Sequence, residues 1–418
     1  MSGEVADIFG RAELGPISLR NRVIKAATFE GRTPAGKVTD DLINFHRAAA
    51  AGGVGMTTVA YCAVSAEGRT ERDQILMTPE AVDGLQRLTD AVHAEGAAAC
   101  AQLGHAGPVA NAKSNGLPAV SPSRLFSPLG MAPSRRPDSE DLRRIVADHA
   151  RAASVAAASG FDAVELHFGH NYLVSSFFSP LLNRRRDGYG GNLANRARLA
   201  REIAVAVREE VGESVAVTAK LNMEDGVPGG LRIEDGLQIG RWLQDDGALD
   251  ALELTVGSSL LNPMYYFRGR APRTEFAGAF PQPLSWFLRT VGRGFLREYP
   301  YEELYLLDLA RQFRYELTMP LILLGGITSR RSMDLAMKEG FDFVAVARAL
   351  LRDPGLVKRI DADPESRSPC THCNRCMVTI FDRTRCVLRP TGTIEPLSSG
   401  SAAGADQSRR RYRPHREP

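Results

Sequence analysis

The chain has 418 residues, of which 44% are hydrophobic and 24% are charged, and its formal net charge is +3. This composition is ordinary for a globular enzyme, and the length allows two or three average domains or one α/β barrel with insertions. No apolar run approaches 18 residues, and the first residues lack the basic start and apolar stretch of a signal peptide, so we expect no membrane span and a cytoplasmic location. Six cysteines do not suggest a secreted disulfide framework.

Short apolar, β-branched runs alternate with longer segments of helical period. Eight strands are predicted, at residues 22–27, 54–60, 97–103, 162–167, 215–221, 250–255, 320–324 and 342–346. Helical patterns lie between most of them, at residues 40–51, 79–95, 141–159, 195–211, 233–246 and 330–339. This alternation indicates parallel strands buried on both faces. Eight such units favour an α/β fold of the (β/α)8 TIM barrel type.

The competing fold is an open dinucleotide-binding sheet, which needs a glycine-rich turn directly after a strand. The only close glycine cluster, at residues 52–55, precedes its predicted strand and indicates the end of a helix and a turn. Two long connections, at residues 104–139 and 257–300, are expected to cover the active face of the barrel. The barrel is therefore the predicted fold.

We expect three parts along the chain: the barrel at 1–355, a short cysteine-containing C-terminal extension at 356–395, and a basic tail at 396–418. The tail is rich in Gly, Ala, Ser and Pro, and its arginines are Arg409, Arg410, Arg411, Arg413 and Arg416. Its composition predicts a solvated, disordered segment. Because no aromatic interleaving or binding fold accompanies the charge, we expect no nucleic-acid partner.

Polar residues follow the fourth predicted strand, and barrels carry their chemistry at the carboxyl ends of strands. His167 and His170 leave this strand three residues apart, so both rings can point at one place. Their N–H groups can hold a carbonyl or nitro oxygen and stabilise the negative charge that develops there. Tyr172 can then protonate carbon as a general acid. The two histidines also suit a metal-ligand pair or a purely structural role.

The segment after the histidines is long and distinctive: residues 178–198 read FSPLLNRRRDGYGGNLANRAR. Together with the histidine pair it resembles the old yellow enzyme family of NAD(P)H:flavin oxidoreductases, in particular the branch nearest the 2,4-dienoyl-CoA reductases. The resemblance extends over roughly residues 5–390. It implies FMN as cofactor, NAD(P)H as co-substrate, and reduction of an activated C=C bond by hydride from flavin N5. The Asn, Arg and Asp side chains of this segment are expected to form a structural network.

The resemblance also implies where the flavin would lie. Ala26, Ala27 and Thr28 end the first strand beside the flavin ring. Ala60 ends the second strand, where a small residue lets the ring approach the backbone. The amide of Gln102, at the end of the third strand, would pair with the pyrimidine edge of the flavin.

Lys220 stands where the family usually has arginine. Its charge would stabilise negative charge at the N1/C2 edge of reduced flavin, without the planar fork of arginine. The alternative for this lysine is a salt bridge to Glu224 or Asp225. The chain also departs from the family at Pro108, where an arginine often stands, and in the first strand, where a shift of one residue decides whether Thr28 touches N5.

A phosphate group is expected between the last two strands, where barrels often bind one with backbone N–H groups. Gly325 and Gly326 follow the seventh predicted strand, and Ala347 and Arg348 follow the eighth. Glycine permits close approach of the phosphate, and Arg348 adds charge and hydrogen bonds. A glycine pair alone more often marks only a turn, so its position after the seventh strand carries this prediction.

Four cysteines gather near the C-terminus, Cys370, Cys373, Cys376 and Cys386, with His372 among them. Closely spaced thiolates suit zinc or a [4Fe–4S] cluster. The dienoyl-CoA reductases carry a cluster at a matching place, but the gaps before their third and fourth cysteines are longer. Those relatives also continue into an FAD/NAD domain, for which we expect no counterpart here. An iron–sulfur cluster, reduced thiols and a disulfide-bonded cap therefore all remain open.

We expect a ping-pong enzyme whose small-molecule substrate is an enone or enoyl compound. Aromatic residues of the connection 257–300 are expected to wall its pocket or to pack in loops: Tyr265, Tyr266, Phe267 and Trp286. One alternative is an FMN-dependent oxidative dehydrogenase or demethylase, which a reducing amine would reveal. A second is a metal-binding interaction protein, which would be colourless. The oligomeric state stays open.

Overall fold

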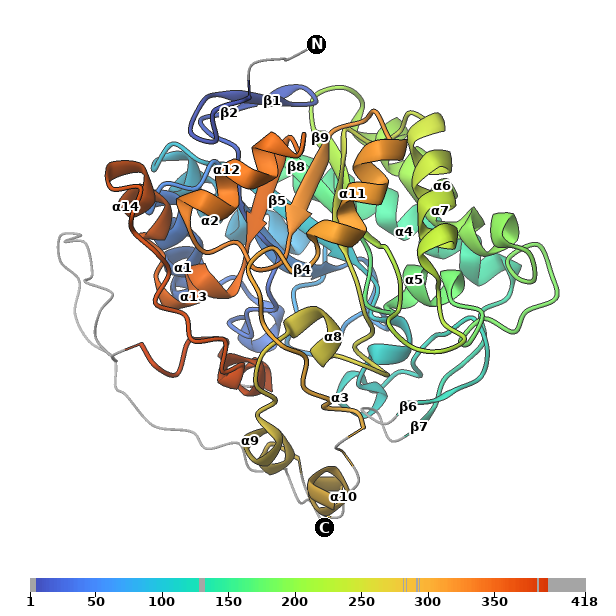
Figure 1. Ribbon diagram of the computed structural model, residues 1–418. Helices are drawn as coiled ribbons and strands as arrows, with labels where there is room; N and C mark the ends of the chain where they lie inside the picture. The colour runs from blue at the N-terminus through green and yellow to red at the C-terminus, as the bar shows by residue number, and fades with distance from the viewer. Residues whose placement is uncertain are drawn as a thin grey trace, which may run out of the picture.

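The computed structural model describes residues 5–127, 132–280, 282, 284–290, 292, 294–381 and 383–389 (Figure 1). Eight parallel strands close into a barrel in the order β10-β11-β12-β3-β4-β5-β8-β9. They are β3 (Val23–Lys25), β4 (Met56–Ala63), β5 (Ala98–Gly104), β8 (Ala163–Phe168), β9 (Ala216–Asn222), β10 (Ala251–Thr255), β11 (Leu321–Leu324) and β12 (Phe343–Val346). Each overlaps a predicted strand, so the predicted TIM barrel is confirmed. The predicted basic tail, including its five arginines, lies outside the described residues.

Helices surround the barrel and bury their apolar faces against the strands. The larger ones are α1 (Asp40–Ala51), α2 (Val82–His93), α4 (Ser139–Ala158), α6 (Leu193–Val211), α7 (Ile233–Asp245), α11 (Leu307–Glu316) and α12 (Arg330–Lys338). Several begin at a capping side chain that accepts a backbone N–H, as Thr39 does for α1, Asp138 for α4 and Ser329 for α12. Among these larger helices, only α11 has no counterpart among the helices predicted from the sequence.

The amino end of the barrel is closed by the hairpin of β1 (Ala12–Leu14) and β2 (Ile17–Leu19), at the top of Figure 1. Leu14 and Leu19 pack with side chains of the barrel interior. These include the small residues Ala163, Ala216 and Ala251, with Phe343 as the large one. The interior is therefore a packed core, and this end leaves no route to it.

The opposite, carboxyl end carries most of the shorter elements, at the bottom of Figure 1. They are η1 (Pro34–Gly36), η2 (Pro79–Ala81), η3 (Gly107–Val109), α3 (Ala112–Asn115), β6 (Phe126–Ser127), β7 (Ala132–Pro133), α5 (Leu173–Phe178), α8 (Met264–Phe267), α9 (Arg273–Gly278), α10 (Leu284–Thr290), α13 (Arg348–Arg352) and η4 (Arg375–Phe381). Helix α14 (Leu356–Ala362) lies instead at the upper left of Figure 1, where the backbone N–H of Lys358 donates to the carbonyl of Gly52 before β4. Helices α9 and α10 project below the barrel and pack beside η4 through Phe276, Leu288 and Met377.

The cysteine-containing extension returns to the first loop of the barrel. The backbone N–H of Thr384 donates to the carbonyl of Glu30 (2.9 Å), and its hydroxyl donates to the carbonyl of Phe29. Arg32 donates in turn to the carbonyl of Thr384 (2.7 Å). The extension is thus bound directly to the loop that follows β3.

No helix in the described part of the chain is both long enough and apolar enough to cross a membrane.

Candidate active site at the carboxyl end of the barrel

The predicted catalytic residues come together where β8 ends. The ring centres of His167 and His170 are 5.3 Å apart, and the ring of Tyr172 lies 4.5 Å from that of His167. Tyr61, at the end of β4, contacts Tyr172 edge to face at 5.5 Å. The ends of β4 and β8 therefore supply one cluster of rings at the carboxyl face of the barrel, where barrel enzymes have their active sites.

The two histidines are held differently. The Nε2 atom of His170 lies 2.9 Å from the hydroxyl of Thr255, and its backbone N–H donates to Asn222 (3.0 Å). Residues 170 and 171 both have positive φ angles, 60° and 57°, an uncommon conformation that turns the chain sharply after the strand. The Nδ1 atom of His167 is buried and has no hydrogen-bond partner among the described residues. A buried polar atom without a partner points to a ligand that would supply one.

Burial sets the protonation of this cluster. It lowers the pKa of His170 to about 3 and lowers the pKa of His167 well below its ordinary value, with Lys220 adding repulsion at both. Burial also raises the pKa of the Tyr172 hydroxyl above its usual 10, helped by the neighbouring Tyr266. Near neutral pH the site therefore offers neutral imidazoles and a protonated phenol.

Of the aromatic residues predicted to wall the pocket, the structure brings Tyr266 to the site. Its ring lies 4.5 Å from that of His170. Phe267 packs on Tyr266 at 4.6 Å, and Tyr265 packs on Tyr299 at 5.3 Å. Trp286 is 62% exposed on the projecting helix α10, so its side chain is not packed into the cluster.

Gln102 and Lys220 lie inside the barrel, next to two buried glutamates. The amide of Gln102 donates to Glu165 (2.6 Å), and Lys220 Nζ lies 3.1 Å from Glu165 and 2.5 Å from Glu253. Burial opposes the lysine charge, but the two carboxylates raise its pKa above the ordinary value. Glu253 has its pKa raised to about 8 by burial and by Glu165. The alternative of a salt bridge to Glu224 or Asp225 is wrong, because the acidic partners of Lys220 lie on the neighbouring strands β8 and β10.

The residues expected beside the flavin ring meet a polar group that the sequence analysis missed. The carboxylate of Glu30 accepts the backbone N–H of Ala60 at 3.0 and 3.1 Å and is 3.2 Å from His46. Lys25 lies 3.8 Å from Glu30 and donates to the hydroxyl of Thr28 (3.4 Å). Ala26 is buried and Ala27 only half-buried at the same rim. The sequence signal for this polar group was the presence of Lys25 and Glu30 in the otherwise mostly apolar stretch 23–30.

The predicted phosphate loops lie at the ends of β11 and β12. Gly325 and Gly326 have φ angles of 105° and 78°, and a Cβ at Gly325 would come within 2.7 Å of Leu306, so both positions require glycine. Their backbone N–H groups, with those of Ala347 and Arg348, have no hydrogen-bond acceptor within the described residues. Such a set of free donors is the usual means of binding an oxyanion.

The side chain of Arg348 is hydrogen-bonded within the protein. It donates to the Asn374 amide oxygen and to the carbonyl of Arg268 (3.2 Å). Arg348 also lines a small, solvent-open cavity, together with Arg352 and all four clustered cysteines, Cys370, Cys373, Cys376 and Cys386. The sequence thus grouped these cysteines correctly. Within the described residues, however, no three His, Cys, Asp or Glu side chains are placed to hold a metal ion.

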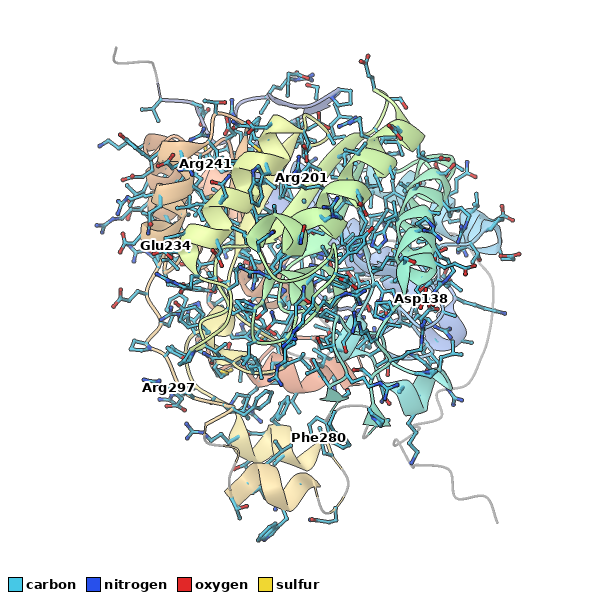
Figure 2. All side chains as sticks on the ribbon, turned by 90° about the vertical axis from the view of Figure 1, so that its right-hand side faces the viewer. Asp138, Arg201, Glu234, Arg241, Phe280 and Arg297 are labelled. Carbon is cyan, nitrogen blue, oxygen red and sulfur yellow. The ribbon has the colours of Figure 1, made fainter. Side chains whose placement is uncertain are left out.

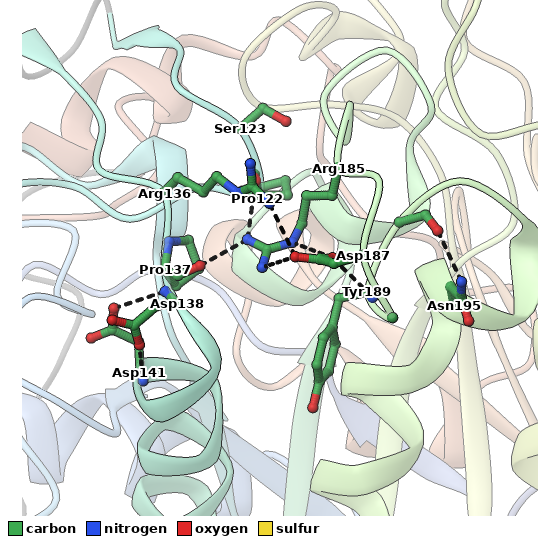
Figure 3. Close-up of polar contacts among 12 residues, drawn as sticks. Pro122, Ser123, Arg136, Pro137, Asp138, Asp141, Arg185, Asp187, Tyr189 and Asn195 are labelled. Atoms are coloured by element: carbon green, nitrogen blue, oxygen red, sulfur yellow. Dashed lines mark hydrogen bonds and ion pairs between the residues drawn. The ribbon is translucent and has the colours of Figure 1, made fainter.

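The long segment after the histidines forms the structural network that was expected (Figure 3). Buried Arg185 donates to both carboxylate oxygens of Asp187 (3.0 and 2.7 Å) and to the carbonyl of Pro137 (2.8 Å). Exposed Arg136 reaches the same carboxylate at 3.0 Å. This network ties the segment after the histidine pair to the start of α4.

The chain is similar in sequence to known proteins. Residues 7–251 match the NADH:flavin oxidoreductase / NADH oxidase family. The chain is 54% identical over 382 residues to 4,4'-dithiodibutanoate disulfide reductase from Rhodococcus erythropolis, covering 91% of this chain and 95% of the relative.

Two solved structures share the fold. A 2-naphthoyl-CoA reductase in complex with 2-naphthoyl-CoA is 25% identical, with a TM-score of 0.77 over 92% of this chain and 57% of that one. Morphinone reductase is 23% identical, with a TM-score of 0.69 over 92% of this chain and 95% of that one. The chain belongs to the NADH:flavin oxidoreductase / NADH oxidase family, the family of old yellow enzyme.

Proposed function

We propose that this protein is an FMN-dependent NAD(P)H oxidoreductase that reduces organic disulfides. The observation that carries the proposal is the cluster of His167, His170 and Tyr172, with a neutral, unpartnered imidazole beside a protonated phenol. The choice of acceptor follows the Rhodococcus relative, which matches this chain over nearly the whole length of both.

The residues present fit an FMN group. The free N–H groups of Gly325, Gly326, Ala347 and Arg348 suit its phosphate. The ring would lie on the small residues Ala26, Ala27 and Ala60, with Thr28, Gln102 and Lys220 at its polar edges. When bound, FMN supplies two-electron chemistry, accepting a hydride from NAD(P)H and passing it to an acceptor.

The chain's own residues bind the acceptor and supply the proton. His167 has a ring nitrogen free to donate to it, and His170 is fixed by Thr255. Tyr172 holds a proton beside His167 and can transfer it to the leaving thiolate. One disulfide, one NAD(P)H and one proton give two thiols and NAD(P)+, so the proton and electrons balance.

An activated C=C bond is the second candidate acceptor, and the histidine pair favours it. Two neutral imidazoles 5.3 Å apart can both donate to a single carbonyl oxygen and so stabilise an enolate. Tyr172 would then protonate carbon. An oxidative dehydrogenase or demethylase would use the same residues in the opposite direction, and reduction of the flavin by an amine in the absence of NAD(P)H would reveal it.

The cysteine cavity has donors of the right chemistry for an iron–sulfur cluster, but their placement does not surround one point. We therefore assign no step of the reaction to a metal.

The test separates the two half-reactions under anaerobic conditions. Holoenzyme is reduced with NADH or NADPH in a stopped-flow instrument, and 4,4'-dithiodibutanoate or 2-cyclohexenone is then added to reoxidise the flavin. We expect the His167→Ala/His170→Ala variant to keep flavin reduction and to lose most acceptor reduction. His93→Ala, on exposed α2, is the control. Unchanged acceptor turnover in the double variant, or wild-type protein that carries no flavin, would defeat the proposal.

A further inference from the structure

The segment that follows β10 links the loop that contains His170 to Arg268. The backbone N–H of Ser259 donates to the carbonyl of His170 (3.0 Å), and Tyr266 of α8 packs its ring on that histidine. Arg268 ends α8, two residues after Tyr266. At the helical rise of about 1.5 Å per residue, Arg268 begins only about 3 Å further along the helix than the residue that touches the site.

Arg268 has an uncommon backbone conformation, and contacts with neighbouring residues fix it in place. Its φ angle is 50°, which is uncommon for a side chain of this size, and Asn374 and Arg348 fix its carbonyl (2.7 and 3.2 Å). Its guanidinium lies over the rings of Tyr265, Tyr299 and Tyr305, at 4.7, 5.0 and 5.8 Å. The aromatic cage and the fixed backbone hold this cation in place before any ligand arrives.

Among the described residues, this guanidinium also lacks a counter-ion. Within the described part of the chain, no carboxylate lies within ion-pair distance of Arg268. Its only hydrogen bond there is from Nε to the carbonyl of Tyr265 (3.1 Å), so both terminal Nη groups are free. A guanidinium fork with two free N–H groups is the side chain best suited to bind a carboxylate or phosphate with two hydrogen bonds.

The charge of the surrounding segment has the same sign. Residues 268–299, which include α9, α10 and the projection marked by Phe280 and Arg297 in Figure 2, contain six arginines and two glutamates. One of the two glutamates, Glu275, already forms an ion pair with Arg375 (3.3 Å) outside this segment. An excess of positive charge beside a site attracts anionic substrates and raises their rate of association.

We propose that Arg268 binds a carboxylate of the acceptor, so that the preferred substrates are organic disulfides with an anionic group a few carbons from the sulfur. This inference rests on the proposed function, and the name of the Rhodococcus relative describes such a compound, a disulfide with a carboxylate on each half. Arg268 is a binding residue and takes no part in hydride or proton transfer. The phosphate of NADPH has the same oxyanion chemistry, so the experiment must distinguish the two sources.

The experiment compares an anionic with a neutral disulfide in the holoenzyme. Initial rates are measured with 4,4'-dithiodibutanoate and with bis(2-hydroxyethyl) disulfide, using NADH and NADPH in turn. The variants are Arg268→Gln, Arg268→Lys and the control Arg270→Gln, which removes an equal charge from an exposed residue two positions away. Bound flavin is quantified by absorbance in every preparation.

We expect Arg268→Gln to raise KM for the dicarboxylate about tenfold or more, the usual loss for one charged hydrogen-bonded pair, with little change in kcat. Its ratio of kcat/KM values, anionic over neutral, should fall by the same factor, and Arg268→Lys should recover part of it. Arg270→Gln should leave the ratio near that of wild type. Raised salt should weaken dicarboxylate binding in wild type more than in Arg268→Gln.

Three results would overturn the inference: an equal effect of Arg268→Gln on both disulfides, a rise in KM for NADPH but not for NADH, which would assign the oxyanion to the nucleotide phosphate, or loss of bound flavin. A wild-type enzyme that is reduced by NAD(P)H but turns over neither disulfide would instead overturn the proposed function.

Discussion

The imidazole of His167 meets the phenol ring of Tyr172 edge to face, with ring centres 4.5 Å apart and an angle of 74° between the planes. The neutral group that would bind the acceptor and the group that would protonate it are therefore neighbours. Because burial shifts the pKa of each group toward its uncharged form, both functions are available in the same pH range.

Tyr172→Phe should slow the acceptor half-reaction and leave flavin reduction by NAD(P)H within about twofold of wild type. General acid catalysis contributes about 100-fold or more, so we expect a loss of that size with an enone, whose carbon must receive the proton. The loss with a disulfide should be smaller, since a thiolate with a pKa of about 8.5 is a stable leaving group near neutral pH. Stopped-flow reoxidation measures both. Tyr189→Phe, whose hydroxyl donates to Glu202 (2.9 Å), is the matched control. Equal losses with both acceptors would contradict this role for Tyr172.

The rate of acceptor reduction should depend little on pH between about 5.5 and 7, below the pKa of about 8 to which burial and Glu165 raise Glu253 beside Lys220. Burial lowers the pKa of His170 to about 3, so this imidazole stays neutral as pH falls through that range. Burial raises the pKa of Tyr172 above 10, so the phenol stays protonated as pH rises. The measurement is the reoxidation rate at saturating enone across this range, with NAD(P)H reduction followed separately. A titration with a midpoint near the ordinary histidine value of about 6.5 would show that the histidines are not kept neutral.

Arg185→Ala should lower the free energy of unfolding by about 2–4 kcal/mol, because it leaves a buried carbonyl and part of a carboxylate without their donor. Arg136→Ala removes the other arginine from the same carboxylate of Asp187. Its side chain is 49% exposed, so that loss should be under about 1 kcal/mol. Urea unfolding at matched flavin occupancy measures both. Equal losses would mean that the network gains nothing from burial.

The clustered cysteines give a prediction that metal analysis decides. If Cys370, Cys373, Cys376 and Cys386 hold a cluster, anaerobically purified protein will contain about four iron atoms and four labile sulfides per chain. Cys376→Ser should then remove the iron, while Cys100→Ser, within the barrel core, should keep it. Full flavin content with no iron or zinc would show that the thiols serve another purpose.

The eight strands could be predicted because a parallel strand buried on both faces is a continuous apolar run. Individual partners could not, because they depend on strand register. The alternative considered for Lys220 was a salt bridge to acids nearby in the sequence, but its register partner across the sheet is Glu253. Glu30 was missed for the same reason, since its carboxylate binds Ala60 from the loop of the neighbouring strand. The histidine pair and the cysteine group were found because each is contained in one short segment.

Because Thr384 is hydrogen-bonded to the loop after β3, truncating the chain before this residue should affect that loop. The loop that accepts these hydrogen bonds also contains Glu30, whose carboxylate fixes Ala60 at the expected flavin rim. A fragment ending at residue 355 would keep every barrel strand and helix α13. It would lose the segment whose Thr384 is hydrogen-bonded to this loop. We expect such a fragment to release its yellow colour on dialysis and, because it also loses the buried side chains of α14, to unfold at a lower urea concentration than the full chain.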